Sequence, residues 1–153
     1  MNHYKISLES FPDTFDELKP LYEKAYKEMM ENLPSGILRE KYDPWISAYL
    51  EAHEAKTLLL FVVRLEGVAV GYCIMFISQD TKDSKLIAYE DYIYLQPDHR
   101  KGLGKLLVKF IISELRARGI DRIYIFPIPS TGLDKVWGRM GFHVTGIAME
   151  MTL

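Results

Sequence analysis

The sequence lacks the features that mark several classes of protein. It contains one cysteine, Cys73, so a disulfide within the chain and a cysteine-based zinc site are both excluded. The 21 acidic and 19 basic side chains nearly balance, unlike the basic surface of a general nucleic-acid-binding protein. The apolar runs are too short to span a membrane, and the four histidines lack metal-ligand spacing. We therefore expect no metal, no membrane segment and no general binding of nucleic acid.

Targeting and linker sequences are also missing. The first residues lack the charged and apolar regions of a signal peptide, and no stretch rich in proline, glycine or serine divides the chain. A chain of 153 residues is long enough to bury a sizeable core. We therefore expect a cytoplasmic protein with a single domain over residues 1–153, and leave a homodimer open.

The first third of the chain predicts one strand and two helices. Alternating apolar residues over 4–8 predict a short strand. Thr14 and Glu17 have the spacing of a capping box, which predicts a helix that begins at Thr14. A second helix is predicted to begin at Asp43-Pro44, an N-cap followed by a proline in the first position. Its expected buried stripe consists of Trp45, Ile46, Tyr49 and Leu50.

The rest of the chain predicts strands around one long amphipathic helix. Residues 57–65 and 68–78 predict an antiparallel hairpin, and 86–95 a third long strand. Apolar residues at helical spacing follow, namely Leu103, Leu106, Leu107, Phe110, Ile111 and Leu115. A strand at 120–126, parallel to the one before the helix, a short helix at 132–140 and a last strand at 142–152 complete the pattern. The order β-α-α-β-β-β-α-β-α-β predicts an α/β (α+β) fold with a mixed sheet flanked by helices.

The turn that opens the long helix has the chemistry of an anion-binding site. Gly102 and Gly104 let backbone N–H groups at the helix N-terminus approach a ligand, and the helix dipole adds positive charge there. Basic side chains cluster in the same turn: His99, Arg100, Lys101 and Lys105. Neither a dinucleotide-binding G-x-G-x-x-G motif nor a P-loop is present. The turn therefore predicts a phosphate-bearing cofactor of another kind.

Together with the element order, this turn resembles the GNAT superfamily of N-acetyltransferases, which use acetyl-coenzyme A. The segment 99–104 resembles the Q/R-x-x-G-x-G/A pyrophosphate loop of the family, with His99 in the first position. The segment 137–142 resembles a Tyr-x-x-x-Gly-Phe pattern, with Trp137 in place of the tyrosine and Gly141-Phe142 at its end. Ser130 stands where relatives favour an asparagine.

The resemblance implies that acetyl-coenzyme A is the co-substrate, bound by this turn, by the strand before it and by the short helix. The residues implied to contact it are Ile93, Tyr94, Leu95, His99, Arg100, Lys101, Gly102, Leu103, Gly104, Lys105, Ser130 and Trp137. It also implies direct attack of an amine on the thioester in a ternary complex, with Glu90, Asp91 and Tyr94 as candidate catalytic residues. Strand alternation directs the two carboxylates to opposite faces, and Glu90 is favoured because relatives often place a glutamate there.

The acceptor is expected to be a small-molecule or protein amine. Family members usually bind it with the first two helices, their loop and the far edge of the sheet, segments that here include Tyr22, Tyr26, Met30, Leu33, Tyr42 and Trp45. Carboxylates that would attract a cationic amine are Glu28, Glu31 and Glu40. The indole of Trp137 is no useful acid, so water or one of Tyr92, Tyr94 and Tyr124 would have to protonate the leaving thiolate. The alternative is a catalytically weak or inactive member that binds coenzyme A or a protein partner.

Overall fold

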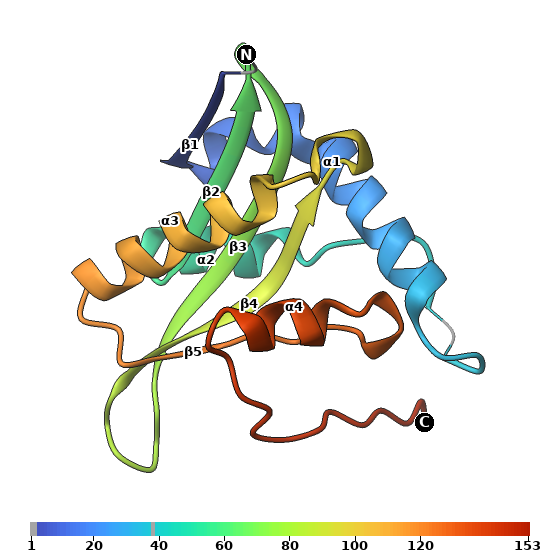
Figure 1. Ribbon diagram of the computed structural model, residues 1–153, viewed down its shortest axis with the longest axis vertical. Helices are drawn as coiled ribbons and strands as arrows, with labels where there is room; N and C mark the ends of the chain where they lie inside the picture. Colours follow the sequence, from blue (N-terminus) through green and yellow to red (C-terminus); the bar gives the residue numbers. More distant parts are fainter. Residues whose placement is uncertain (1–2, 38) are drawn as a thin grey trace.

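The computed structural model describes residues 3–37 and 39–153 and has a five-stranded sheet in the order β1-β2-β3-β4-β5 (Figure 1). Its strands are β1 Tyr4–Glu9, β2 Leu58–Leu65, β3 Val68–Gln79, β4 Leu86–Leu95 and β5 Arg122–Tyr124. The first four strands pair antiparallel with their neighbours, whereas β4 and β5 are parallel. This arrangement confirms the predicted mixed sheet and the predicted parallel pair.

Helices cover both faces of the sheet. They are α1 Phe11–Asn32, α2 Ile46–Glu54, α3 Leu103–Ala117 and α4 Leu133–Arg139. The central position of β2 between the two helical layers is seen in its burial, because all its residues from 58 to 63 are buried. Leu60 and Val62 pack with α1, whereas Phe61 and Val63 pack with Leu107 and other residues of α3. A strand covered on both faces has a continuous apolar sequence instead of an alternating one.

The helix α1 begins three residues before the predicted start, so the capping box at Thr14 and Glu17 is wrong. The cap is Ser10, whose hydroxyl oxygen accepts a hydrogen bond from the Asp13 N–H at 3.4 Å. The Thr14 hydroxyl instead donates to the Ser10 carbonyl at 2.7 Å. The early start follows from Phe11, which is buried, and therefore draws the first turn onto the core.

The helix α2 also differs from its predicted form. It begins at Ile46, and Trp45 and Leu50 of the expected buried stripe are exposed, the indole of Trp45 by 75%. Tyr49 does pack inward, with its ring stacked on Phe11 at 5.1 Å between centroids. Residues 41–45 therefore form an irregular segment before α2 instead of its first turn.

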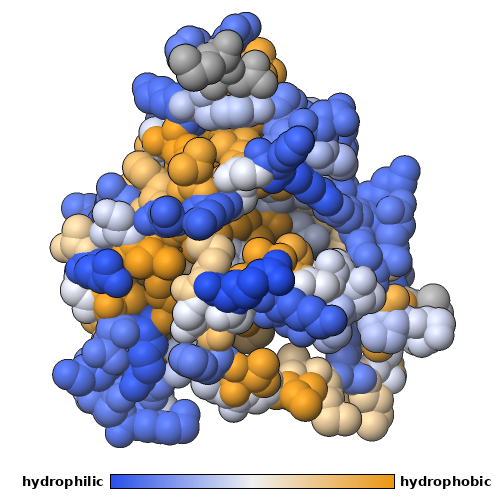
Figure 2. Space-filling view, in the orientation of Figure 1, coloured by the Kyte–Doolittle hydropathy of each residue, from blue (hydrophilic) through white to orange (hydrophobic). Residues whose placement is uncertain are grey.

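The predicted last strand at 142–152 is wrong. In the described part of the chain no strand follows α4, and exposed apolar side chains lie along this segment: Val144, Ile147, Met149, Met151 and Leu153. Figure 2 shows such side chains along the lower margin of the molecule, where Figure 1 draws the C-terminal segment. The alternation of Ile147, Met149 and Met151 is typical of a strand, but a strand forms only where a neighbouring strand can pair with it. The strand β5 has three residues and therefore offers a very short edge for pairing.

A close approach between β3 and β4 requires glycine at position 71. A Cβ atom there would lie 2.4 Å from Leu95 Cδ2 and 2.7 Å from the Tyr94 carbonyl oxygen. The second neighbour is backbone, so it cannot move aside without disturbing the pairing of Gly71 with Leu95. This contact fixes the end of β4 from which the glycine turn starts.

We predict that Gly71→Ala lowers the free energy of unfolding by roughly 1–3 kcal/mol, because the added methyl group overpacks the β3–β4 contact. Urea denaturation followed by circular dichroism measures this change. The matched control is Gly138→Ala in α4, where a Cβ atom meets nothing within 4 Å. The control should be neutral or stabilising by up to about 1 kcal/mol. Equal stability of the two variants would contradict the close approach.

Candidate active site

The strands β4 and β5 part after a short parallel ladder. They pair at Ile87 with Arg122, Ala88 with Ile123 and Tyr89 with Tyr124, and the ladder ends there. The chain then turns away from β4 through Pro127 and Pro129, which have no N–H to donate. From Glu90 to Leu95, the edge of β4 that faces away from β3 therefore has no strand partner among the described residues. An extended ligand could pair with it as an added strand.

Glu90 lies across the opening between the two strands. Its side chain is on the α3 face of the sheet, and its Oε1 accepts a hydrogen bond from the Phe126 N–H at 3.0 Å. Burial raises the pKa of this carboxyl to about 6, although the Phe126 hydrogen bond lowers it and the charge of Asp91 adds to the rise. A carboxyl with this pKa can exchange a proton near neutral pH.

A β-bulge at Asp91 reverses the side-chain alternation of β4. Ile74 pairs with Tyr92 and Met75 with Glu90, so Asp91 is an extra residue in the ladder. As a result Asp91 and Tyr92 both line a cavity on the α1–α2 face, and Glu90 remains on the α3 face. Simple alternation correctly separates the two carboxylates, but nothing in the sequence indicates that Tyr92 joins Asp91.

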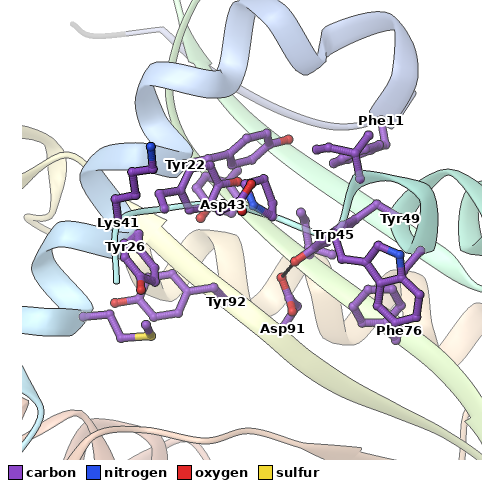
Figure 3. A pocket seen from close by; sticks show the side chains of 17 residues that line it. Phe11, Tyr22, Tyr26, Lys41, Asp43, Trp45, Tyr49, Phe76, Asp91 and Tyr92 are labelled. Atoms are coloured by element: carbon purple, nitrogen blue, oxygen red, sulfur yellow. Dashed lines mark hydrogen bonds between the residues drawn. The ribbon is translucent and has the colours of Figure 1, made fainter. Parts of the chain in front are cut away.

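The cavity beside Asp91, here called the aromatic cavity, has a volume of about 500 Å³ (Figure 3). Residues of α1, α2, the segment 41–45, β3 and β4 line it, and its aromatic members are Phe11, Tyr22, Tyr26, Tyr42, Trp45, Tyr49, Tyr72, Phe76 and Tyr92. Four of the six side chains expected to bind an acceptor are among them, whereas Met30 and Leu33 do not line the cavity. Tyr72 and Phe76 were missed, although their spacing along one strand places them on the same face.

Asp91 receives one hydrogen bond inside this cavity. The Tyr49 hydroxyl donates to its Oδ2 at 2.8 Å, as the dashed line in Figure 3 marks. Asp91 is accessible to solvent, but the side chains around it exclude enough water to raise the pKa of its carboxyl. The hydrogen bond from Tyr49 opposes that rise.

The glycine turn offers free N–H groups at the start of α3. Gly102 is the N-cap, with φ of +80°, a left-handed conformation that favours glycine, and no side chain caps the helix. A Cβ at Gly104 would have only an ordinary contact, 3.8 Å to Leu95 Cδ1. Lys101 and Lys105 are exposed beside the turn, whereas Leu103 is buried in the core. The first N–H groups of α3 can therefore bind an anion.

His99 and Arg100 are engaged within the protein. The Nδ1 atom of His99 is 3.0 Å from the Tyr4 hydroxyl. The Arg100 guanidinium donates to the Leu95 carbonyl at 2.8 Å and pairs with Glu28 of α1. Both side chains anchor the turn to the strands and to α1, and Glu28 is therefore already paired with a cation.

The remaining sequence-predicted residues lie around the opening of the strands. Trp137 is buried on the α3 face near Glu90, and its ring meets Phe142 edge to face at 5.3 Å. Tyr94 is buried on the α1 face, where loss of water raises the pKa of its hydroxyl. The Ser130 hydroxyl donates to the Asn32 carbonyl at 2.7 Å, which ties the start of α4 to the end of α1.

Within residues 3–37 and 39–153, no group of three or more His, Cys, Asp or Glu side chains could hold a metal ion. No helix in these residues has the length and apolar character needed to span a membrane.

Comparison with known proteins gives a family match and structural neighbours. The family model of the acetyltransferase (GNAT) family matches residues 12–142. No curated protein matches the chain in sequence. The structure is similar to an aminoglycoside acetyltransferase from an uncultured soil metagenomic sample, in complex with trehalose, at 17% identity and a TM-score of 0.75, covering 98% of this chain and 96% of the other.

Two further solved structures are similar over their whole length. An aminoglycoside N-acetyltransferase in complex with CoA has 19% identity and a TM-score of 0.75, with 100% of this chain and 96% of the other covered. Glucosamine-6-phosphate N-acetyltransferase from Arabidopsis thaliana has 14% identity and a TM-score of 0.70, with 98% of each chain covered. At these identities the likeness shows the fold, and it confirms the predicted mixed sheet flanked by helices.

We predict that Glu90→Gln changes how stability depends on pH. The folded pKa of about 6 lies above the ordinary value of 4.5, so the wild type loses stability as pH rises through this range. Glutamine stays uncharged and keeps an oxygen that can accept from Phe126. The stability of the variant relative to the wild type should therefore increase by about 2 kcal/mol between about pH 4 and pH 7.5. Urea denaturation across this range tests it, and a pH-independent difference would contradict the buried carboxylate.

Proposed function

The chain belongs to the acetyltransferase (GNAT) family, and we propose that it transfers an acetyl group from acetyl-coenzyme A to the amino group of an acceptor. The observation that carries this proposal is the open edge of β4 next to the uncapped N-terminus of α3. One element can hold an extended chain and the other a phosphate group, which are the two parts of coenzyme A. Bound acetyl-coenzyme A supplies an acetyl group activated as a thioester, which an amine can take up as an amide.

The turn at 99–105 would hold the pyrophosphate. Uncapped N–H groups of α3 would donate to it, and the exposed Lys101 and Lys105 would add charge. His99 and Arg100 would contribute by fixing the backbone of the turn, because their side chains already bind Tyr4, Leu95 and Glu28. An aminoglycoside N-acetyltransferase of similar fold has been solved in complex with CoA, which supports this use of the fold.

The open edge of β4 would hold the pantetheine arm. In the segment from Ile93 to Leu95, backbone groups that face away from β3 would make strand-like hydrogen bonds, except the Leu95 carbonyl, which accepts from Arg100. A free backbone N–H near the bulge would stabilise the developing charge on the thioester oxygen, a contribution of roughly 2.7–4 kcal/mol per donor.

Glu90 is the proposed general base. It lies in the opening between β4 and β5, and with a pKa of about 6 it is mostly ionised at pH 7.5 and able to take a proton from an amine, directly or through water. Tyr94 is the proposed proton donor for the leaving thiolate, because it lies on β4 at the open edge and its hydroxyl is protonated at neutral pH. Trp137 cannot take that role, since an indole N–H is not acidic enough.

The buried Trp137 also favours a second candidate function. A chain that binds coenzyme A without transferring its acetyl group would need the turn and the open edge but no acid at this position. Release of the coenzyme A thiol in the presence of amines separates the two candidates, since only an active enzyme releases it faster than the buffer does.

We predict that acetyl-coenzyme A binds the wild type in the micromolar range by isothermal titration calorimetry, and that Gly104→Leu weakens binding at least about tenfold. A Cβ atom at this position would lie 3.8 Å from Leu95 in the free protein, so the variant should remain folded. The loss would therefore come from blocked approach of the phosphates to the backbone. Gly104→Ala, which the family pattern allows, is the matched control and should keep most of the affinity. Equal affinity of wild type and Gly104→Leu, or no binding at millimolar ligand, would contradict the proposed cofactor site.

We also predict that Glu90→Gln lowers the rate of thiol release by about 10²–10⁴-fold. In the wild type, kcat/KM should rise with pH through about 6 and then level off, because only the ionised carboxyl accepts a proton. The variant should lose this rise. Glu54→Gln, at the exposed last position of α2 and outside the aromatic cavity, is the matched control and should keep it. A rise near pH 6 that persists in Glu90→Gln would rule out Glu90 as the base.

A further inference from the structure

The aromatic cavity is lined by none of the residues proposed to hold coenzyme A. It lies on the α1–α2 face, whereas Glu90, Trp137 and α3 lie on the other side of the sheet. Its volume of about 500 Å³ falls within the range of about 300–1,000 Å³ that small-molecule sites have. A second small substrate therefore has a place of its own, separate from the open edge of β4.

The walls of this cavity suit an apolar or aromatic body. Nine of its 17 lining residues are aromatic. Figure 3 shows Tyr26 and Tyr92 on one side of Asp91, with Trp45 and Phe76 on the other. Aromatic rings stack on flat apolar groups, and their faces also attract an organic cation. Trp45, which precedes α2 and is 75% exposed, offers an aromatic face at the cavity rim. A ligand that stacks on it would displace no core contact.

The charges in the cavity suit a single positive charge. Its charged lining residues are Lys41, Asp43 and Asp91, with a formal sum of −1. The three glutamates expected from the sequence to attract a cation, Glu28, Glu31 and Glu40, do not line the cavity, and Glu28 pairs with Arg100. With two carboxylates, Asp43 and Asp91, and one lysine, the cavity has fewer carboxylates than an acceptor with three or four ammonium groups would need.

Asp91 is the carboxylate in position to bind that charge. The Tyr49 hydroxyl fixes its orientation through Oδ2, which leaves Oδ1 for a donor in the cavity. The residue before it in the chain is Glu90, in the opening between β4 and β5. An ammonium group bound by Asp91 would therefore lie next to the bulge, one residue along β4 from the proposed base, whose side chain is on the opposite face of the sheet.

We infer that the acceptor is a compact primary amine with one positive charge on an aromatic or other apolar body, and that Asp91 binds its ammonium group in the aromatic cavity. This inference rests on the proposed acetyl transfer. In that reaction the ammonium loses one proton to Glu90 or solvent, the nitrogen bonds to the acetyl carbon, and the carbon–sulfur bond breaks. The thiolate takes up the second proton, so the products are an amide, coenzyme A thiol and one proton.

The test compares three probes on the full-length wild-type chain. They are 2-phenylethylamine, its uncharged match 2-phenylethanol, and spermine, a polycation without a ring. Calorimetric titration without acetyl-coenzyme A measures binding, and thiol release measures turnover. We expect 2-phenylethylamine to bind at least about tenfold more tightly than either comparison compound and to give the highest kcat/KM. Preference for spermine, or equal binding of the amine and the alcohol, would overturn the inference.

Two variants locate the binding site. Asp91→Asn should raise the Kd and KM for 2-phenylethylamine at least about tenfold and leave the Kd for acetyl-coenzyme A unchanged. Glu51→Gln, at an exposed position of α2 outside the cavity, makes the same change in net charge and should alter none of these constants. Unchanged amine binding in a folded Asp91→Asn would overturn the role of Asp91, and the three-probe comparison stands even if this variant does not fold.

The two proposals fail in different ways. If 2-phenylethylamine binds through Asp91 but no amine releases the thiol, acetyl transfer is wrong and the amine site stands. If thiol is released with other amines while 2-phenylethylamine neither binds nor reacts, acetyl transfer stands and the inferred acceptor class is wrong.

Discussion

The parting of β4 and β5 is the constraint on which the rest of the structure depends. The two strands are parallel and joined through α3, yet their ladder ends at Tyr89 and Tyr124 because the following chain turns away through two prolines. One edge of β4 stays open beyond that point, and α3 begins soon after the same strand ends. Backbone groups that can pair with an extended ligand therefore adjoin N–H groups that can bind a phosphate.

The bulge at Asp91 adds a second constraint within the same strand. It leaves Glu90 on the α3 face, in the opening between the strands, and turns Asp91 and Tyr92 together toward the aromatic cavity. Two adjacent carboxylates thereby acquire different surroundings. Glu90 is nearly enclosed and hydrogen-bonded to backbone, whereas Asp91 is open to solvent and held by Tyr49. Different surroundings allow one carboxylate to move a proton while the other binds a charge.

Local sequence patterns predict much of this fold, and the failures share a physical cause. The strand at 86–95 and the helix after Gly102 follow from β propensity, helical periodicity and glycine chemistry, and the structure has both. The capping box at Thr14 fails because burial of Phe11 decides where α1 starts. The last strand fails because pairing needs a neighbour that no local pattern reveals. The bulge at Asp91 and the Tyr49 hydrogen bond to its carboxylate arise in the same way, from contacts between distant segments, so the cavity could be predicted only in part.

The central claim is that the open edge of β4 and the start of α3 together receive acetyl-coenzyme A. Amide hydrogen exchange, followed residue by residue by NMR with and without the ligand, tests it most directly. The account predicts that acetyl-coenzyme A slows exchange at Ile93–Leu95, where a ligand pairs with the strand, and in the turn at 102–105. Slowing confined to the α1–α2 face, with no change in these two segments, would contradict it.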